Sequence, residues 1–143
     1  MSTILITGAS GGLAQEMVKL LPNDQLILLG RNKEKLAQLY GNHPQAEFVE
    51  IDITDGTVLE TLVAELYQRY GKIDVLINNA GYGIFEDFDK ISDQDIHQMF
   101  EVNTFALMNL SRLVAARMKE IRKGHIINIV SMAGLIATGK SSL

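Results

Sequence analysis

The chain has 143 residues, of which 47% are hydrophobic, and carries a formal net charge of -4 at pH 7. Lysine and arginine are not concentrated in any stretch, which argues against a nucleic-acid partner. The absence of cysteine excludes disulfides, thiolate metal sites and a cysteine nucleophile, and it suits a reducing compartment, so we expect a cytoplasmic protein. No basic leader precedes the first apolar run, and no run approaches the roughly 18 apolar residues of a membrane span. We therefore expect no membrane partner.

Short apolar runs alternate along the chain with longer amphipathic segments. Five of these runs have the length and composition of strands, at 4–6, 26–29, 48–51, 75–77 and 126–130. Strands that are uniformly apolar are typical of a sheet covered on both faces, so we expect all five to be buried. Alternation of strands with crossover helices requires parallel pairing and right-handed connections. The sequence therefore predicts an α/β fold built on a doubly wound parallel sheet.

The segments between the strands show helical spacing of apolar residues. In the first and third segments these residues are Leu13, Met17, Leu20 and Leu21, and Val58, Leu62, Leu66 and Tyr70. Glycines that are expected to end helices are Gly41, Gly71 and Gly124. The fourth region is the longest: a capping signature at 92–95 begins it, helical spacing continues to about Arg122, and Asn103 interrupts it. No linker or repeat divides the chain, so residues 1–143 are predicted to form one domain.

A glycine-rich turn, Thr7-Gly8-Ala9-Ser10-Gly11-Gly12-Leu13-Ala14, follows the first strand and leads directly into a helix. Gly8 permits a tight turn, Gly12 lets the backbone approach a pyrophosphate, and the small Ala14 allows close packing of helix on strand. The helix N-terminus adds unpaired N–H donors and a partial positive charge. A tight turn without a ligand is the alternative, but the position between the first strand and the first helix favours ligand binding.

Further motifs occur in register with this turn. Asp52 follows the third strand, Asn78-Asn79-Ala80-Gly81 follows the fourth, Asn103 lies in the long helical region, and Ser131 follows the fifth strand. Together with the spacing Thr-Gly-x-x-x-Gly-x-(Gly/Ala), they resemble the motifs of the short-chain dehydrogenase/reductase family along the whole chain. The resemblance implies a Rossmann-type fold and NAD(P)-dependent oxidoreduction of a small-molecule carbonyl or alcohol substrate.

The resemblance also assigns roles to individual residues. It implies that the backbone carbonyl of Asn103 holds a water of the proton relay and that Ser131 holds the substrate carbonyl. The residues that it places around the cofactor are Thr7, Gly8, Ser10, Gly12, Leu13, Arg31, Asp52, Ile53, Asn79, Ala80 and Gly81. For Asp52, an acid at a helix start is the alternative interpretation. The resemblance further implies a homo-oligomer of the intact parent, in which the helix at about 103–122 pairs across a two-fold axis with a helix that these residues lack.

The end of the second strand bears on the choice between NAD and NADP. An acidic residue there accepts a hydrogen bond from the ribose 2′-OH and repels a 2′-phosphate. In this chain that place is taken by Gly30, and Arg31 follows it, with Lys33 and Lys35 nearby. A guanidinium is suited to bidentate phosphate contact, so NADP is favoured over NAD. The alternative for Arg31 is an ordinary solvated cation at a helix start.

One element of the family pattern is missing from these residues. The family uses the tyrosine of a Tyr-x-x-x-Lys pair as its acid and base, but residues 40, 67, 70 and 82, the four tyrosines, are followed four positions later by Pro44, Gly71, Asp74 and Glu86. The family usually places that tyrosine thirteen residues after the serine, one position beyond Leu143. We therefore expect a sheet truncated to about five strands and an inactive chain. The alternative to an origin in an oxidoreductase is a non-catalytic nucleotide-binding or interaction fragment.

The sequence contains residues typical of two other kinds of site. Residues 134–141 satisfy the phosphate-loop pattern Gly-x-x-x-x-Gly-Lys-(Ser/Thr) and follow a strand, which would indicate a nucleoside-triphosphate hydrolase. No helix follows to supply the N-terminal dipole, and the first turn already provides a phosphate site, so we interpret Lys140 as a loop cation. His43, His97 and His125 lack metal-ligand spacing, and no metal is expected.

Overall fold

The five expected strands are present and form one parallel sheet. The computed structural model describes residues 1–131 of the chain. Its strands are β1 (Thr3–Ile6), β2 (Gln25–Gly30), β3 (Ala46–Glu50), β4 (Val75–Asn78) and β5 (His125–Asn128). They lie in the order β3-β2-β1-β4-β5, and each neighbouring pair is parallel. The predicted α/β fold, a doubly wound Rossmann-type sheet, is confirmed.

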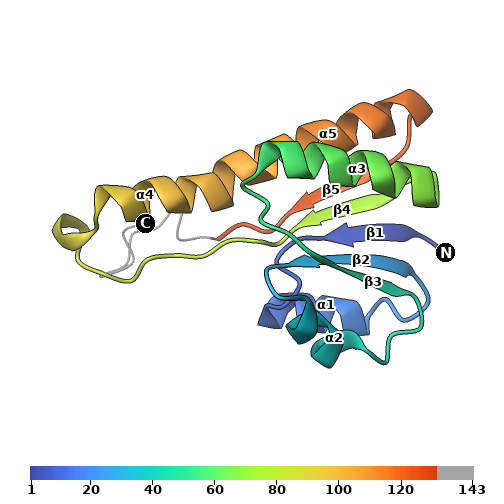
Figure 1. The fold of residues 1–143 in the computed structure, drawn as a ribbon, viewed down its shortest axis with the longest axis horizontal. Helices are drawn as coiled ribbons and strands as arrows, with labels where there is room; N and C mark the ends of the chain where they lie inside the picture. The colour runs from blue at the N-terminus through green and yellow to red at the C-terminus, as the bar shows by residue number, and fades with distance from the viewer. Residues whose placement is uncertain (132–143) are drawn as a thin grey trace.

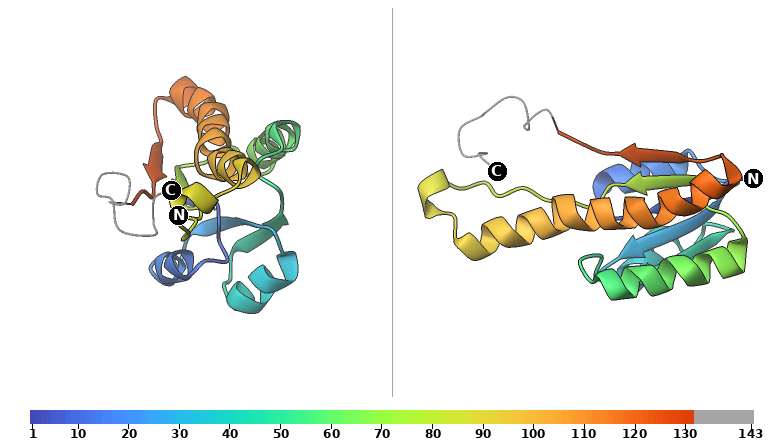
Figure 2. Two further views of the ribbon diagram at one scale, coloured as in Figure 1. Left: turned by 90° about the vertical axis from the view of Figure 1, so that its left-hand side faces the viewer. Right: turned by 90° about the horizontal axis from the view of Figure 1, so that it is seen from above.

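Helices cover both faces of this sheet (Figure 1). On one face lie α1 (Gly12–Lys19) and α2 (Lys33–Tyr40), and on the other lie α3 (Gly56–Tyr70) and α5 (Ala106–Ile121). The 3₁₀ turn η1 (Phe88–Lys90), helix α4 (Asp93–Phe100) and the π-helical turn η2 (Glu101–Phe105) precede α5. Helix α4, η2 and α5 follow one another without a break and form one long helical rod. The α4 end of this helical rod projects beyond the carboxyl ends of the strands (Figure 2). Within residues 1–131, none of the helices has the length and apolar character needed to cross a membrane.

Alternate residues of the central strands fill two separate cores. Leu5, Ile27 and Leu76 belong to the core beneath α3 and α5, where Leu66 and Val114 are also buried. The other core, beneath α1 and α2, contains the intervening strand residues Ile4, Ile6, Leu26, Leu28 and Ile77. Successive side chains of a strand point to opposite faces, so an uninterrupted apolar run serves both cores. Each fully buried aliphatic side chain contributes about 1.5–3 kcal/mol relative to exposure.

The expectation that every strand is buried is wrong for the two edge strands. In β3 the residues are half-buried and Glu50 is exposed, and in β5 Ile126 is half-buried while the others are exposed. The cause is position in the sheet, because an edge strand has a neighbour on only one side and the described helices cover it incompletely. The composition of the two runs does not reveal this.

The buried faces of two helices also differ from the predicted stripes. In α1 the buried residues are Ala14 and Val18, whereas Leu13 is 52% exposed and Leu20, which follows the helix, is 81% exposed. In α3, Leu62 and Leu66 are buried as predicted. Leu59 is buried as well, whereas the preceding Val58 is 44% exposed. In each helix, apolar residues at helical spacing form two adjacent rows along the helix surface. Contact with the sheet determines which residues of these rows are buried.

The ends of the helices follow the sequence signals in part. Gly71 ends α3 in the left-handed conformation with φ of 74°, as expected of a C-terminal glycine. Gly41 follows α2 with an ordinary φ of -57°, and α5 ends at Arg122, with φ of 55°, rather than at Gly124. The hydroxyl of Ser92 accepts from the backbone N–H of Asp95 at 3.1 Å, so the predicted start of α4 is confirmed.

The strand order creates a crevice where the direction of winding changes. From β1 the chain proceeds through β2 to β3, and it then returns to β4 on the other side of β1. The helices that follow β1 and β4 therefore leave in opposite directions, which opens a space at the carboxyl ends of these two strands. The glycine-rich turn follows β1 and the segment 79–82 follows β4, so both predicted motifs lie at this switch point.

Candidate functional site

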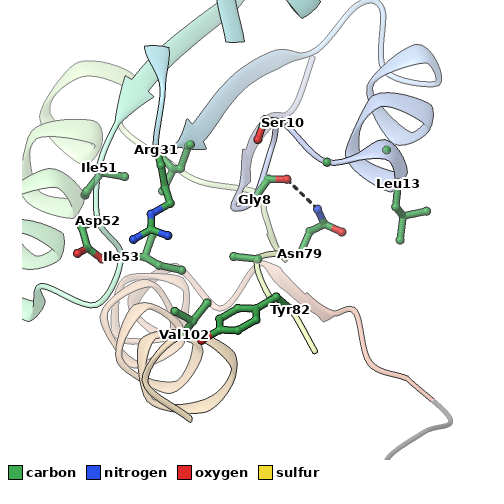
Figure 3. A pocket seen from close by; sticks show the side chains of 16 residues that line it. Gly8, Ser10, Leu13, Arg31, Ile51, Asp52, Ile53, Asn79, Tyr82 and Val102 are labelled. Atoms are coloured by element: carbon green, nitrogen blue, oxygen red, sulfur yellow. Dashed lines mark hydrogen bonds between the residues drawn. The ribbon is translucent and has the colours of Figure 1, made fainter. Parts of the chain in front are cut away.

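The glycine-rich turn is held closely against the loop that follows β4. Gly8 has a left-handed φ of 59°, and a Cβ atom at this position would lie 2.7 Å from the Cα of Ala80. The side chain of Asn79 donates to the carbonyl oxygen of Gly8 at 3.1 Å (Figure 3). Both the backbone conformation and the close approach require a residue without a side chain at Gly8.

The buried side chain of Thr7 also connects the glycine-rich turn to the loop that follows β4. Its side chain is 2% exposed, and its hydroxyl oxygen accepts from the backbone N–H groups of Asn79 at 3.0 Å and Ala80 at 2.9 Å. The backbone N–H of Thr7 donates to the carbonyl of Ile77 at 3.1 Å. Thr7 is therefore a buried support of the site, and it does not line the cleft described next.

A cleft of about 510 Å³ opens between the two loops and the ends of β2 and β3. It is lined by ten of the eleven residues predicted to surround the cofactor, namely Gly8, Ser10, Gly12, Leu13, Arg31, Asp52, Ile53, Asn79, Ala80 and Gly81. These residues come from four separate segments of the chain. The sheet topology brings them together at one edge, as the positions of the motifs after successive strands predict.

The N-terminus of α1 faces this cleft without a side-chain cap. The residue at the cap position is Gly11, which makes no side-chain hydrogen bond, and Gly11, Gly12 and Leu13 all line the cleft. The first N–H groups of a helix have no partner within the helix. They carry the positive end of the helix dipole and suit an anion such as a phosphate. A Cβ atom added at Gly12 would meet no atom within 4 Å, so the space beside this residue is open.

Charged groups of opposite sign stand at the far end of the cleft. Arg31 follows β2 and Asp52 lies beyond β3, and both side chains line the cleft (Figure 3). The pKa of the Asp52 carboxyl is lowered first by a hydrogen bond from the Thr54 hydroxyl at 2.7 Å. The Thr54 backbone N–H lowers this pKa further, burial opposes the shift, and the positive charge of Arg31 also lowers it. Asp52 is therefore an anionic acceptor at neutral pH.

Asn103 lies in the π-helical turn η2, at the interruption that the sequence predicts. The backbone N–H of Ala106 donates to the carbonyl of Glu101, five residues earlier, instead of four. The Asn103 side chain accepts from the N–H of Tyr82 at 3.0 Å and donates to the carbonyl of Tyr82 at 2.6 Å. This pair of bonds joins the helical rod to the loop after β4. Asn103 itself is not among the residues that line the cleft.

Ser131 is exposed and lies three residues beyond the last paired residue of β5. It does not line the cleft, so the structure does not bring it together with the cofactor residues. The strand that leads to it is fixed by Asn78, which is buried and whose side-chain amide donates to the Ser111 hydroxyl and to the Asn128 side chain, each at 2.9 Å. The first asparagine of the motif 78–81 thus joins β4, α5 and β5.

Several lining residues carried no signal that the sequence analysis used. Leu29, Ile51, Tyr82 and Val102 all line the cleft. The sequence pattern indicates only that Leu29 and Ile51 belong to strands. Tyr82 directly follows the motif 78–81 and Val102 directly precedes Asn103, so their proximity to recognised motifs was the available signal.

Among residues 1–131, no cluster of three or more histidine, cysteine, aspartate or glutamate side chains is arranged to hold a metal ion. The phosphate-loop pattern at 134–141, with Lys140, lies outside the described residues.

A doubly wound parallel sheet with a glycine-rich turn and an uncapped helix at its switch point defines a Rossmann-type α/β protein. The chain belongs to the short chain dehydrogenase family, whose family model matches residues 2–142. The family that the motifs resemble is thereby confirmed.

Individual relatives agree with this assignment. The ketoacyl reductase HetN of Nostoc sp. is 36% identical over 138 residues, which cover 92% of this chain and 48% of the relative. A metagenomic short-chain oxidoreductase in complex with NADP is 27% identical, with a TM-score of 0.88 over 98% of this chain and 66% of that one. NAD⁺-bound xylitol dehydrogenase is 26% identical, with a TM-score of 0.88 over 99% of this chain and 57% of that one. The chain spans about half the length of the curated relatives it matches.

Proposed function

We propose that this chain is the cofactor-binding part of an NAD(P)-dependent oxidoreductase that acts on a small-molecule carbonyl or alcohol. The observation that carries the proposal is the cleft at the switch point, where the uncapped N-terminus of α1 and the backbone of the glycine-rich turn face the same space as Arg31 and Asp52. The donor set fits a dinucleotide, because open N–H groups suit the pyrophosphate and an anionic acceptor suits the adenosine end.

We further propose that the cofactor is NADP rather than NAD. Gly30 places no carboxylate at the end of β2, and the Arg31 guanidinium beside it supplies a charge-assisted donor for a 2′-phosphate. The comparisons do not decide this point, since one similar structure contains NADP and another contains NAD⁺. Arg31 is therefore the residue on which the NADP assignment rests.

The chain's own residues support the reaction in different ways. A bound nicotinamide supplies the hydride chemistry, and the protein supplies orientation and charge. We assign to Ser131 a hydrogen bond to the reacting oxygen and to the Asn103 carbonyl a water of the proton relay. The π-helical turn supports the second role, because backbone carbonyls in such a turn leave the regular four-residue hydrogen-bond pattern.

The acid that completes this relay is not among the 143 residues, since none of the four tyrosines is followed four positions later by lysine. We therefore propose that these residues alone bind the cofactor without turnover. The second candidate function, a non-catalytic nucleotide-binding or interaction module, shares this property. The two candidates are distinguished by assaying the intact parent for NADPH-dependent reduction of a panel of carbonyl compounds.

We also propose that the parent is a homo-oligomer.

Calorimetric titration of the 143-residue chain with NADPH and with NADH tests the cofactor proposal. A charge-assisted contact contributes about 1.5–3 kcal/mol, so Arg31→Ala should weaken NADPH binding about ten- to a hundred-fold and leave NADH binding nearly unchanged. Lys35→Ala, which removes a neighbouring positive charge outside the cleft lining, is the matched control. Equal loss of both cofactors in Arg31→Ala removes the case for NADP, and no binding of either cofactor by the wild type refutes dinucleotide binding.

A further inference from the structure

Tyr40 connects helix α2 to the glycine-rich turn, a contact that no motif predicts. Its hydroxyl donates to the carbonyl oxygen of Ala9 at 2.5 Å, across 31 positions of sequence. The Tyr40 side chain is 6% exposed, and Ala9 is fully buried. Both residues belong to the core beneath α1 and α2, and neither lines the cleft.

The carbonyl that Tyr40 holds belongs to the same peptide unit as the N–H of Ser10. A trans peptide is planar, and its C=O and N–H groups point in opposite directions. Because the Ala9 carbonyl points into the core toward Tyr40, the Ser10 N–H is directed away from the core. Ser10 and the following Gly11 and Gly12 line the cleft.

The neighbouring peptides of the turn are held by backbone hydrogen bonds and by the Asn79 side chain, which donates to the Gly8 carbonyl at 3.1 Å. The Ala9 N–H donates to the Leu29 carbonyl at 3.0 Å, and the Gly11 N–H donates to the Gly8 carbonyl at 3.1 Å. Between these two bonds, the orientation of the Ala9–Ser10 peptide is held by the side chain of Tyr40. Burial raises the pKa of the Tyr40 phenol above its ordinary value, so at neutral pH the hydroxyl keeps its proton and can donate.

We propose that Tyr40 is a positioning residue for the pyrophosphate subsite, which aligns the Ser10 N–H toward the bound cofactor through the Ala9 carbonyl. The inference rests on the proposed dinucleotide function. Removal of the hydroxyl leaves a buried carbonyl without its partner, and rotation of the peptide toward a new donor relieves this cost. That rotation moves the Ser10 N–H out of alignment. Only ligands that reach the turn are affected.

The test compares two ligands that differ in whether they reach the turn. NADPH contains the pyrophosphate, whereas adenosine 2′-monophosphate lacks it and, under the proposed function, occupies only the end of the cleft at Arg31 and Asp52. Tyr40→Phe removes one oxygen atom and keeps the ring in the core. Tyr70→Phe is the matched control, because the Tyr70 hydroxyl also donates at 2.5 Å, to the Glu47 carboxylate, outside the cleft lining.

Titration of the 143-residue chain and both variants should separate the ligands. We expect Tyr40→Phe to lose about tenfold in NADPH affinity while its affinity for adenosine 2′-monophosphate stays within about twofold of wild type. Tyr70→Phe should bind both ligands as the wild type does. Unchanged NADPH affinity in Tyr40→Phe overturns the inference, and so does an equal loss of both ligands, which would show that Tyr40 only stabilises the fold. A wild-type chain that binds neither ligand overturns the proposed function itself.

Discussion

Thr7 shows how a residue of the glycine-rich motif acts without facing a ligand. Its buried hydroxyl accepts two backbone N–H groups from the loop after β4, 72 and 73 positions along the chain. The resemblance places Thr7 among the cofactor residues, but its position beneath the turn gives it a supporting role. The hydroxyl satisfies two donors that an apolar side chain of the same shape would leave unpaired.

Replacement of this hydroxyl should therefore affect stability before it affects binding. We expect Thr7→Val to lower the free energy of unfolding by about 1–3 kcal/mol, because the N–H groups of Asn79 and Ala80 lose their acceptor. Thr7→Ser keeps the oxygen and should lose less. Urea unfolding followed by circular dichroism measures both variants. A valine variant as stable as the serine variant would show that the two hydrogen bonds contribute nothing.

Tyr70 gives a pH dependence whose sign follows from the structure. Burial, and then the hydrogen bond to the Glu47 carboxylate, raise the pKa of Tyr70 to about 12 from an ordinary value of 10.0. The folded state therefore holds the phenol proton more tightly than the unfolded state does. The resulting stabilisation is complete below about pH 10 and is lost as the pH rises through about 12.

The corresponding measurement compares wild type with Tyr70→Phe between pH 9 and pH 12. We expect the difference in free energy of unfolding between the two proteins to be constant below about pH 10 and to shrink above it. Subtraction of the variant removes the contribution of lysines and of the other tyrosines, which titrate in the same range. A difference that does not change with pH would contradict the assigned pKa.

At the scale of the element, the glycine-rich turn uses two of its glycines for different purposes. Gly8 is required by the fold, since it has a left-handed φ of 59° and contacts Ala80. Gly12 is the first residue of α1, its φ is negative, and a methyl group there meets no atom within 4 Å. The second position is therefore open in the protein itself, and we expect the ligand to require the space.

Alanine substitutions should separate these two purposes. Gly8→Ala combines left-handed strain with a steric overlap, so we expect a loss of at least about 2 kcal/mol in the free energy of unfolding. Gly12→Ala should leave stability unchanged or slightly higher, because alanine is the better helix former, but should weaken NADPH binding. Thermal unfolding and NADPH titration of both variants give the comparison. Wild-type NADPH affinity in Gly12→Ala would show that the pyrophosphate does not approach this residue.

At the scale of the whole molecule, the two sheet edges differ in their protection. On β3, the exposed Glu50 places a negative charge at the edge, and Glu47 forms an ion pair with Arg69 there. On β5, Ile127 is 46% exposed, Ile129 and Val130 beyond it are also exposed, and no acidic residue or lysine interrupts the strand. Within residues 1–131, no strand pairs with the outer side of β5. An apolar unpaired edge favours association with a similar edge.

We therefore expect the 143-residue chain to self-associate through β5. Ile127→Lys places a charge on this strand and should shift the chain toward monomer, since edge charges oppose intermolecular pairing. Val58→Lys, at a residue of α3 that is 44% exposed, is the control for a general effect of added charge. Size-exclusion chromatography with light scattering at several concentrations measures the outcome. A monomeric wild type, or equal effects of the two variants, would exclude β5 as the association surface.

Local patterns in the sequence were sufficient for the element order and for most of the cleft. The five apolar runs, the helical segments and the glycine-rich turn are recognisable because residue spacing and backbone geometry act within a few positions of the chain. The placement of motifs after successive strands then predicts that Gly8, Asp52 and Asn79 meet, since the carboxyl ends of parallel strands share one edge.

Tertiary contacts decided the remaining features. Neighbours distant in sequence determine that Ala14 rather than Leu13 is buried and that β5 is exposed. They also supply the hydrogen-bond partners of Thr7 and Tyr40. A threonine in a turn or a tyrosine in a helix has no local signal for such a partner. Periodicity identifies which residues can be buried, but the packing of a helix on a particular strand determines which are buried and which hydroxyl meets which carbonyl.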